Sequence, residues 1–179
     1  MAEGDPYLAV VGAVCKEVTN LGLTPILVGG MALVMLGSRR VTRDFDFVIA
    51  SPDDRLEALI AVFYSRGLEL ASRLNDDGDV VATIDNPRVA AARLKVDAPS
   101  SASFFNPQTT LRIDLLFDFP ISASELAKHA RRVTVQSQVL RMASEKDLLR
   151  LTRIARDRRS APGDAQDIAF LEARRKRSR

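Results

Sequence analysis

The segment 29–49 constrains the fold more than any other part of the 179 residues. A glycine pair, Gly29 and Gly30, opens a short apolar stretch expected to be a helix, and after a basic loop comes a strand with two aspartates. Side chains on a strand alternate between its faces, so Asp44 and Asp46 are predicted to point the same way, about 6–7 Å apart. The phenylalanines that follow each aspartate then point into a core.

Two carboxylates on one face of a strand repel each other unless a cation lies between them. A hard divalent cation such as Mg²⁺, or Mn²⁺ in its place, suits this position because it prefers oxygen ligands and binds phosphates on its open side. The glycine pair offers backbone N–H groups near a helix N-terminus, which is an anion site, although a tight turn alone would also use two glycines. Together these features predict metal-dependent phosphoryl or nucleotidyl transfer.

Residues 29–46 read Gly-Gly-x-Ala-x-x-x-x-Gly-x-x-Arg-x-Thr-x-Asp-x-Asp. This order resembles the active-site signature of the nucleotidyltransferase superfamily, which has the polymerase-beta-like fold. Within that group it most resembles the AbiEii-like enzymes, many of which are toxins of bacterial toxin–antitoxin pairs. The resemblance implies that the aspartate pair and a third aspartate on a later strand hold two Mg²⁺ ions, which activate an acceptor hydroxyl and stabilise the pyrophosphate leaving an NTP. It also implies a cognate antitoxin as a partner.

Asp114 is the candidate for the third carboxylate. It lies in the middle of an apolar strand expected over 111–119, where an unpaired charge is very costly, and the order of the strands matches that of the family. The alternative is an ion pair with a nearby arginine, since Arg112 shares its face of the strand. Asp118, at the strand end, is the fallback ligand or a solvated residue.

The loop before the aspartates matches further family positions. Arg40 and Thr42 fall on the Arg-x-Thr of the family pattern, and the glycine pair is expected to cradle the triphosphate. An arginine fork suits phosphate oxygens. Locking of the loop against Asp44 or Asp46 is the alternative role for the arginine, and ordering of the loop is the alternative for the threonine.

The C-terminal part resembles the family's lysine-bearing helix, but Thr152 stands where the lysine is expected. Two readings follow from this departure. Either Arg150 or Arg153 supplies the charge from an adjacent turn and contacts the nucleotide, or the protein is a slow or inactive module that binds nucleotide or RNA. Asp164 and Asp167 match the family's Asp-x-x-Asp-Ile helix and are expected to form caps and salt bridges rather than to bind metal.

We expect an α/β (α+β) fold: a small mixed β-sheet with flanking helices on one side and a short C-terminal helical part. Residues 1–143 would form the nucleotidyltransferase core, and residues 144–179 a helical extension packed on it with a basic tail. Residues 85–103 carry no clear pattern. The predicted helices span 6–21, 30–36, 51–66, 122–128, 144–157 and 164–176, and the predicted strands 24–28, 44–50, 67–73, 80–84, 111–119 and two within 131–142.

Composition excludes several classes of protein. One cysteine and one histidine rule out an internal disulfide and argue against a zinc site, and the low cysteine content fits a reducing, cytoplasmic location. The uncharged segment 18–38 is long enough to cross a membrane, but Pro25, glycines and polar residues interrupt it, so we expect no membrane span.

Charge is uneven along the chain. Residues 150–179 contain 10 basic and 4 acidic residues, whereas the whole chain carries a net charge of only +3. The basic tail 174–179 favours an RNA partner, and a helix end stabilised by its dipole is the alternative explanation. The family resemblance implies an acceptor that is RNA, such as a tRNA end, or a protein hydroxyl, with a small aminoglycoside as a third choice. The basic tail favours RNA among these.

Overall fold

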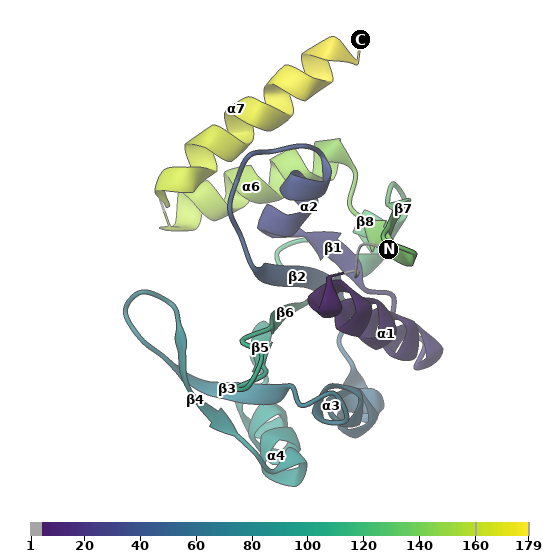
Figure 1. The fold of residues 1–179 in the computed structure, drawn as a ribbon, viewed down its shortest axis with the longest axis vertical. Helices are drawn as coiled ribbons and strands as arrows, with labels where there is room; N and C mark the ends of the chain where they lie inside the picture. Colours follow the sequence, from purple (N-terminus) through teal and green to yellow (C-terminus); the bar gives the residue numbers. More distant parts are fainter. Residues whose placement is uncertain (1–4, 160, 179) are drawn as a thin grey trace.

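The computed structural model describes residues 5–159 and 161–178, which form one mixed sheet with helices on both faces (Figure 1). The eight strands of this part of the chain lie in the order β4-β3-β5-β6-β2-β1-β8-β7. Two neighbouring pairs, β2–β6 and β1–β8, are parallel and the others are antiparallel. The strands are β1 (Ile26–Val28), β2 (Asp44–Ile49), β3 (Glu69–Leu74), β4 (Val80–Ile84), β5 (Ser101–Phe105), β6 (Arg112–Phe117), β7 (Arg131–Val135) and β8 (Gln138–Met142).

The helices divide between the two faces of the sheet. In Figure 1, α1, α3 and α4 lie on one side, and α2 with the C-terminal pair α6 and α7 lies on the other. The predicted mixed α/β fold is confirmed. The expectation of flanking helices on one side only is wrong, because helices cover both faces of the sheet. The helices are α1 (Pro6–Asn20), α2 (Gly29–Met35), the short 3₁₀ helix η1 (Asp53–Arg55), α3 (Leu56–Tyr64), α4 (Pro87–Asp97), α5 (Ala123–Ala127), α6 (Glu145–Arg159) and α7 (Pro162–Arg177).

The face of the sheet opposite the aspartates forms the apolar core. Phe45 and Phe47 of β2 are 4% and 2% exposed, and their partners on β6 are equally buried. Deeper in this layer, Phe63 of α3 stacks on Phe104 of β5 with ring centroids 4.1 Å apart. The alternation predicted for β2 is therefore present: its phenylalanines pack inward, which directs the aspartates to the other face.

Several boundaries differ from the sequence prediction, each for a local reason. Helix α4 lies within 85–103, where no element was predicted; Asn86 caps it by accepting hydrogen bonds from the N–H groups of Arg88 (2.9 Å) and Val89 (3.3 Å), and Pro87 is its first residue. The predicted helix 51–66 starts with the 3₁₀ turn η1 instead. Helices α6 and α7 extend into the predicted linker 158–163.

The proposed division at residue 143 coincides with the start of α6 and stays a prediction. Leu148 of α6 and Leu171 of α7 belong to the same buried cluster as the strands. The uncharged segment 18–38 is divided between the end of α1, strand β1 and helix α2. Among the residues that the structure describes, no helix has the length and apolar character needed to cross a membrane.

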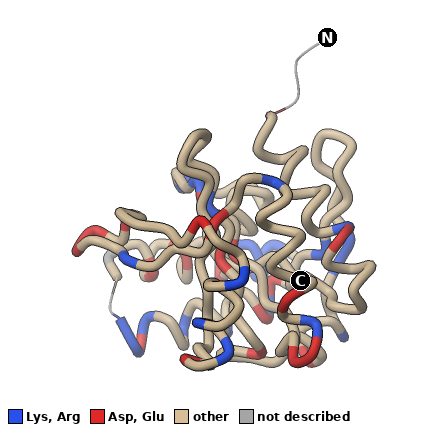
Figure 2. Tube along the Cα trace, turned by 90° about the horizontal axis from the view of Figure 1, so that it is seen from below, with Lys and Arg blue, Asp and Glu red and all other residues tan. Residues whose placement is uncertain are grey.

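Acidic and basic residues occur close together over much of the trace (Figure 2). The uneven charge of the sequence therefore does not divide the molecule into one acidic and one basic half.

The stacked phenylalanine pair should dominate the stability of the β3–β5–β6 half of the sheet. Phe104→Ala removes a ring that is 0% exposed, and we expect it to lower the free energy of unfolding by about 3–5 kcal/mol in urea titration. The control Val96→Ala, at a side chain 83% exposed, should change it by less than about 0.5 kcal/mol. Equal effects of the two substitutions would contradict this account of the core.

Candidate active site

A cavity of about 370 Å³ lies between the aspartate face of the sheet and the C-terminal helices. Its floor comes from β2 and β6, one corner from the start of α2, and the opposite wall from α6 and α7. Small-molecule sites have similar volumes. Its charged lining residues are Asp44, Asp46, Asp114, Asp164 and Asp167 with Arg40, Arg112, Arg158 and Arg159.

The parallel pairing of β2 with β6 brings the three predicted carboxylates together. In this register Asp46 lies directly opposite Asp114, and Asp44 lies opposite Arg112. Directly opposed residues of neighbouring strands have their side chains on the same face, so the carboxylates from positions 68 residues apart become neighbours. The carboxylate of Asp114 is 18% exposed and that of Asp46 is half-buried.

This cluster holds more negative charge than its surroundings compensate. Burial, assisted by the neighbouring carboxylates of Asp114 and Asp44, raises the pKa of Asp46 to about 7. Burial also raises the pKa of Asp44, against the opposing effect of Arg112. Carboxyl groups with raised pKa values on one wall of a cavity are characteristic of functional sites.

Arg112 is the cation nearest to these carboxylates. Its Nε donates to Asp114 Oδ1 at 2.8 Å, its Nη1 to the carbonyl of Gly78 at 2.8 Å, and its Nη2 to Ser103 Oγ at 3.3 Å. Burial opposes its charge, yet the hydrogen bond and the three aspartates raise the pKa of Arg112 overall. The ion pair considered as the alternative role of Asp114 is thus present, and Asp114 lines the cavity as well.

The donor set fits a hard divalent cation. All three carboxylates offer oxygen ligands, which Mg²⁺ and Mn²⁺ prefer, and the hydrogen bond from Arg112 engages only one oxygen of Asp114. Within residues 5–159 and 161–178, however, no three acidic, histidine or cysteine side chains already lie together as a metal-binding group. The role of Asp44, Asp46 and Asp114 as metal ligands therefore stays a prediction.

The glycine pair lies against these functional side chains. Gly29 has φ +68°, and a β-carbon there would lie 2.9 Å from Cγ of Asp46. A β-carbon on Gly30 would lie 3.0 Å from Nε of Arg40 and 3.2 Å from Cγ2 of Thr42. The structure thus brings the predicted glycine, arginine, threonine and aspartate positions to one corner. Close approach of side chains requires glycine here, in addition to the turn.

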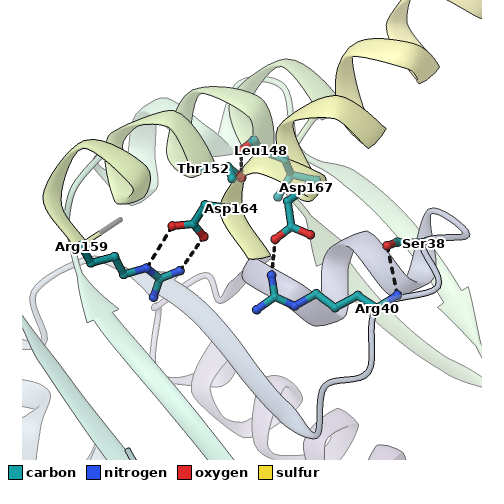
Figure 3. A network of polar contacts seen from close by, with 7 residues as sticks. All are labelled: Ser38, Arg40, Leu148, Thr152, Arg159, Asp164 and Asp167. Carbon is teal, nitrogen blue, oxygen red and sulfur yellow. Dashed lines mark hydrogen bonds and ion pairs between the residues drawn. The ribbon is translucent and has the colours of Figure 1, made fainter. Parts of the chain in front are cut away.

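Two ion pairs lie at the opposite wall, and one of them connects it to the loop before β2 (Figure 3). Arg40, in the loop before β2, pairs with Asp167 of α7. Arg159 at the end of α6 donates from Nη2 to Asp164 Oδ1 at 3.1 Å and from Nε to Oδ2 at 3.4 Å. Asp164 is only 1% exposed and Asp167 only 6%. The salt bridges predicted for them are confirmed, and the loop arginine is fixed by α7 rather than by the aspartates of β2.

Other predicted residues lie elsewhere. Arg153 pairs with Glu172 at 2.7 Å and is not among the residues that line the cavity. Arg150 pairs with Glu125, also outside it. Asp118, the fallback ligand, instead accepts hydrogen bonds from the backbone N–H groups of Ser51 and Ala123, and it does not line the cavity.

The sequence reading missed Arg158 and Arg159, which line the cavity from the end of α6. Thr152 lies in the lining two turns earlier, and its Oγ1 donates to the carbonyl of Leu148 at 2.8 Å. Helical periodicity was the available signal, because residues seven positions apart share a face, so Arg159 follows Thr152 on one side of α6. Arg158 and Arg159 thus bring positive charge to the wall of the cavity that Thr152 also lines.

Comparison with known proteins supports this view of the fold. No known family profile matches the sequence, and neither does any curated protein. Among solved structures, the chain is similar to an antigenic nucleotidyltransferase-like protein from Paracoccidioides brasiliensis, with 16% identity, a TM-score of 0.59, and coverage of 94% of this chain and 76% of that one. The lincosamide antibiotic adenylyltransferase LnuA, solved with lincomycin, gives 11% identity, a TM-score of 0.54, and coverage of 92% and 95%.

A third similar structure is ANT(2″)-Ia in complex with adenylyl-2″-tobramycin, at 12% identity with a TM-score of 0.56, covering 93% of this chain and 88% of that one. At such identities the likeness establishes the fold. The chain has the fold of nucleotidyltransferase-like proteins, and these structures do not distinguish the AbiEii-like subtype.

The close approach at Gly29 gives a test on stability. Gly29→Ala combines a left-handed backbone with a clash against Asp46, whereas Gly37→Ala at the other end of α2 has φ +95° and open space around the added carbon. We expect the control to lower the free energy of unfolding by about 1–2 kcal/mol and Gly29→Ala to lower it further, measured by urea titration. Equal losses would show that the turn alone requires the glycine.

The raised pKa of Asp46 predicts a pH dependence in the metal-free protein. Its carboxyl binds a proton up to about pH 7 in the folded state but only to about 3.8 when unfolded, so this group lowers stability as the pH rises through that window. Asp46→Asn removes the penalty, and it should raise the free energy of unfolding at pH 8 by on the order of 2 kcal/mol.

At pH 5 the gain from Asp46→Asn should largely disappear, because the native carboxyl is then neutral. The measurement is urea unfolding in EDTA at both pH values. A gain of the same size at pH 5 would show that the carboxylate is not the cause.

Proposed function

We propose that the protein is a metal-dependent nucleotidyltransferase that transfers NMP from an NTP to a hydroxyl acceptor and releases pyrophosphate. The observation that carries this proposal is the register of β2 and β6, which sets Asp46 opposite Asp114 in a cavity whose far wall carries Arg158 and Arg159. One wall suits a metal ion and the other suits phosphate oxygens.

The acidic and the basic residues of the cavity would have different roles. Asp44, Asp46 and Asp114 would hold Mg²⁺ or Mn²⁺, which when bound neutralises phosphate charge and activates the acceptor oxygen. Arg159 would contact phosphate oxygens from the opposite wall, and Arg40 would contact them at the corner where Gly29, Gly30 and Thr42 would receive the triphosphate. The ion pairs with Asp167 and Asp164 hold the arginines in place before the nucleotide arrives, which reduces the entropy lost on binding.

In the reaction, the acceptor hydroxyl oxygen attacks the α-phosphorus and forms a new P–O bond. The bond to the bridging oxygen breaks, pyrophosphate leaves with its electron pair, and the hydroxyl proton is lost. The cavity contributes positioning and charge neutralisation, which account for most catalysis of phosphoryl transfer.

The choice of acceptor rests on the positive charge of the C-terminal part of the chain. The similar structures include one named with an adenylylated tobramycin and one with lincomycin, which describes those proteins. The basic C-terminal part of this chain favours RNA, such as a tRNA end, over a protein hydroxyl or an aminoglycoside. Since α6 and α7 form one wall of the cavity, the extension 144–179 would belong to the active site. An AbiEii-like toxin with a cognate antitoxin is the corresponding biological setting.

The second candidate function is a nucleotide- or RNA-binding module without catalysis. Two observations favour it. Thr152 stands in place of the family's lysine, and its hydroxyl donates a hydrogen bond to the helix backbone. Arg112 already compensates the charge of one carboxylate, that of Asp114. A purely structural protein, the third hypothesis, would bind no nucleotide in a metal-dependent way.

Label transfer separates these functions. Incubation with Mg²⁺ or Mn²⁺, α-labelled NTPs and total RNA, protein or aminoglycoside acceptors should give labelled acceptor with the wild type. Asp46→Asn should reduce transfer by 100-fold or more, on the order of 3 kcal/mol of lost stabilisation. Metal-dependent nucleotide binding without transfer to any acceptor would identify the module instead.

A matched pair of arginine substitutions tests which residue replaces the missing lysine. Arg159→Gln should weaken NTP binding by about 10-fold, since a charge-assisted contact contributes about 1.5 kcal/mol, while Arg153→Gln should leave it unchanged. Binding is measured by calorimetry with a non-hydrolysable NTP. The reverse order of effects would restore the sequence-based assignment of Arg153.

A further inference from the structure

A second pocket continues the active-site cavity along α2 and α7. The start of α2, through Leu33, lines the active site, and its end, Leu36 and Gly37, lines the second pocket. On α7 the corresponding order is Asp164 and Asp167 first, then Phe170, Arg174 and Arg177. The lining thus passes from one pocket to the other along the same two helices.

The charge of the lining changes along this path. The active-site cavity holds five aspartates beside four arginines, whereas the second pocket, as far as the structure describes its lining, contains three arginines and no acidic residue. These are Arg39, next in sequence to the active-site Arg40, together with Arg174 and Arg177 of α7. We call this second pocket the arginine pocket.

The arginine pocket has one fixed and two exposed cations. Arg174 donates from Nη1 to the carbonyl of Leu36 at 2.8 Å and from Nη2 to Glu145 at 3.0 Å, and its guanidinium lies 5.9 Å from the ring of Phe170. This contact ties α7 to the end of α2. Arg39 and Arg177, by contrast, are exposed side chains at the rim. A guanidinium in such a position binds phosphate oxygens well.

We propose that the arginine pocket binds backbone phosphates of a single-stranded RNA whose end lies in the active-site cavity. The proposal rests on the proposed nucleotidyl transfer, and it adds the path of the acceptor. From Asp164 to Arg177 the helix rises about 20 Å, which is enough for several nucleotides of an extended strand. A small antibiotic acceptor would need no such path, because it would fit within the first cavity.

The competing explanation is that these arginines only stabilise the C-terminal ends of α2 and α7, where the helix dipoles are negative. The two explanations differ in what a substitution changes. A structural role predicts lower stability with unchanged RNA affinity, and an RNA contact predicts the opposite.

The test is fluorescence anisotropy of the full chain with a short labelled oligouridylate in EDTA, over a range of salt concentrations. Arg39→Gln/Arg177→Gln is compared with Arg93→Gln/Lys95→Gln, which removes the same charge from half-exposed side chains of α4, on the other face of the sheet. We expect the first variant to lose about 10-fold in affinity and to reduce the salt slope by about 1.4, and the second to match the wild type.

Equal losses in the two variants, no loss in the first, or no RNA binding by the wild type would each overturn the proposal. Thermal unfolding of both variants reports a structural role separately. Because binding is read without metal or catalysis, the result is independent of the label-transfer assay. RNA bound at this pocket, with no label transferred to any acceptor, would refute the nucleotidyltransferase and leave the RNA path standing.

Discussion

The parallel pairing of β2 with β6 is the constraint on which the candidate site depends. It places Asp46 opposite Asp114 and thereby collects three carboxylates from two distant segments on one face of the sheet. A shift of one residue in this register would turn Asp114 toward the core and Ile113 toward the cavity. The buried partners on the opposite face, Phe47 and Leu115, oppose that shift because each register position has its own apolar contact.

Bringing the carboxylates together in a buried place disfavours their charged forms, as the raised pKa of Asp46 shows. Arg112 offsets part of this charge by its hydrogen bond to Asp114. Arg112 connects the carboxylate cluster to the turn between β3 and β4 through the carbonyl of Gly78, and to β5 through Ser103. One guanidinium therefore compensates part of the charge and joins three segments of the sheet. A divalent cation would supply the remaining compensation.

The C-terminal helices complete the cavity through ion pairs. Asp167 holds Arg40 across a sequence separation of 127 residues, and Asp164 holds Arg159 at the end of the same helical hairpin. Without α7, two arginines of the cavity would lose the carboxylates that orient them. The same helix continues into the arginine pocket, so it takes part in both sites.

The sequence by itself determined the local elements and their chemistry. Alternation in β2 fixed the common face of Asp44 and Asp46, because strand geometry depends only on neighbouring residues. Spacing to the glycine pair likewise predicts a phosphate-binding corner, and Asn86 and Pro87 carry the local capping signal for α4. What tertiary structure alone decided was which distant charges meet: the approach of Asp46 to Asp114, the position of Arg159 rather than Arg153 at the cavity, and the pairing of Arg40 with α7. Those outcomes depend on strand register and helix packing, which sum many weak contacts across the chain and leave no local pattern in the sequence.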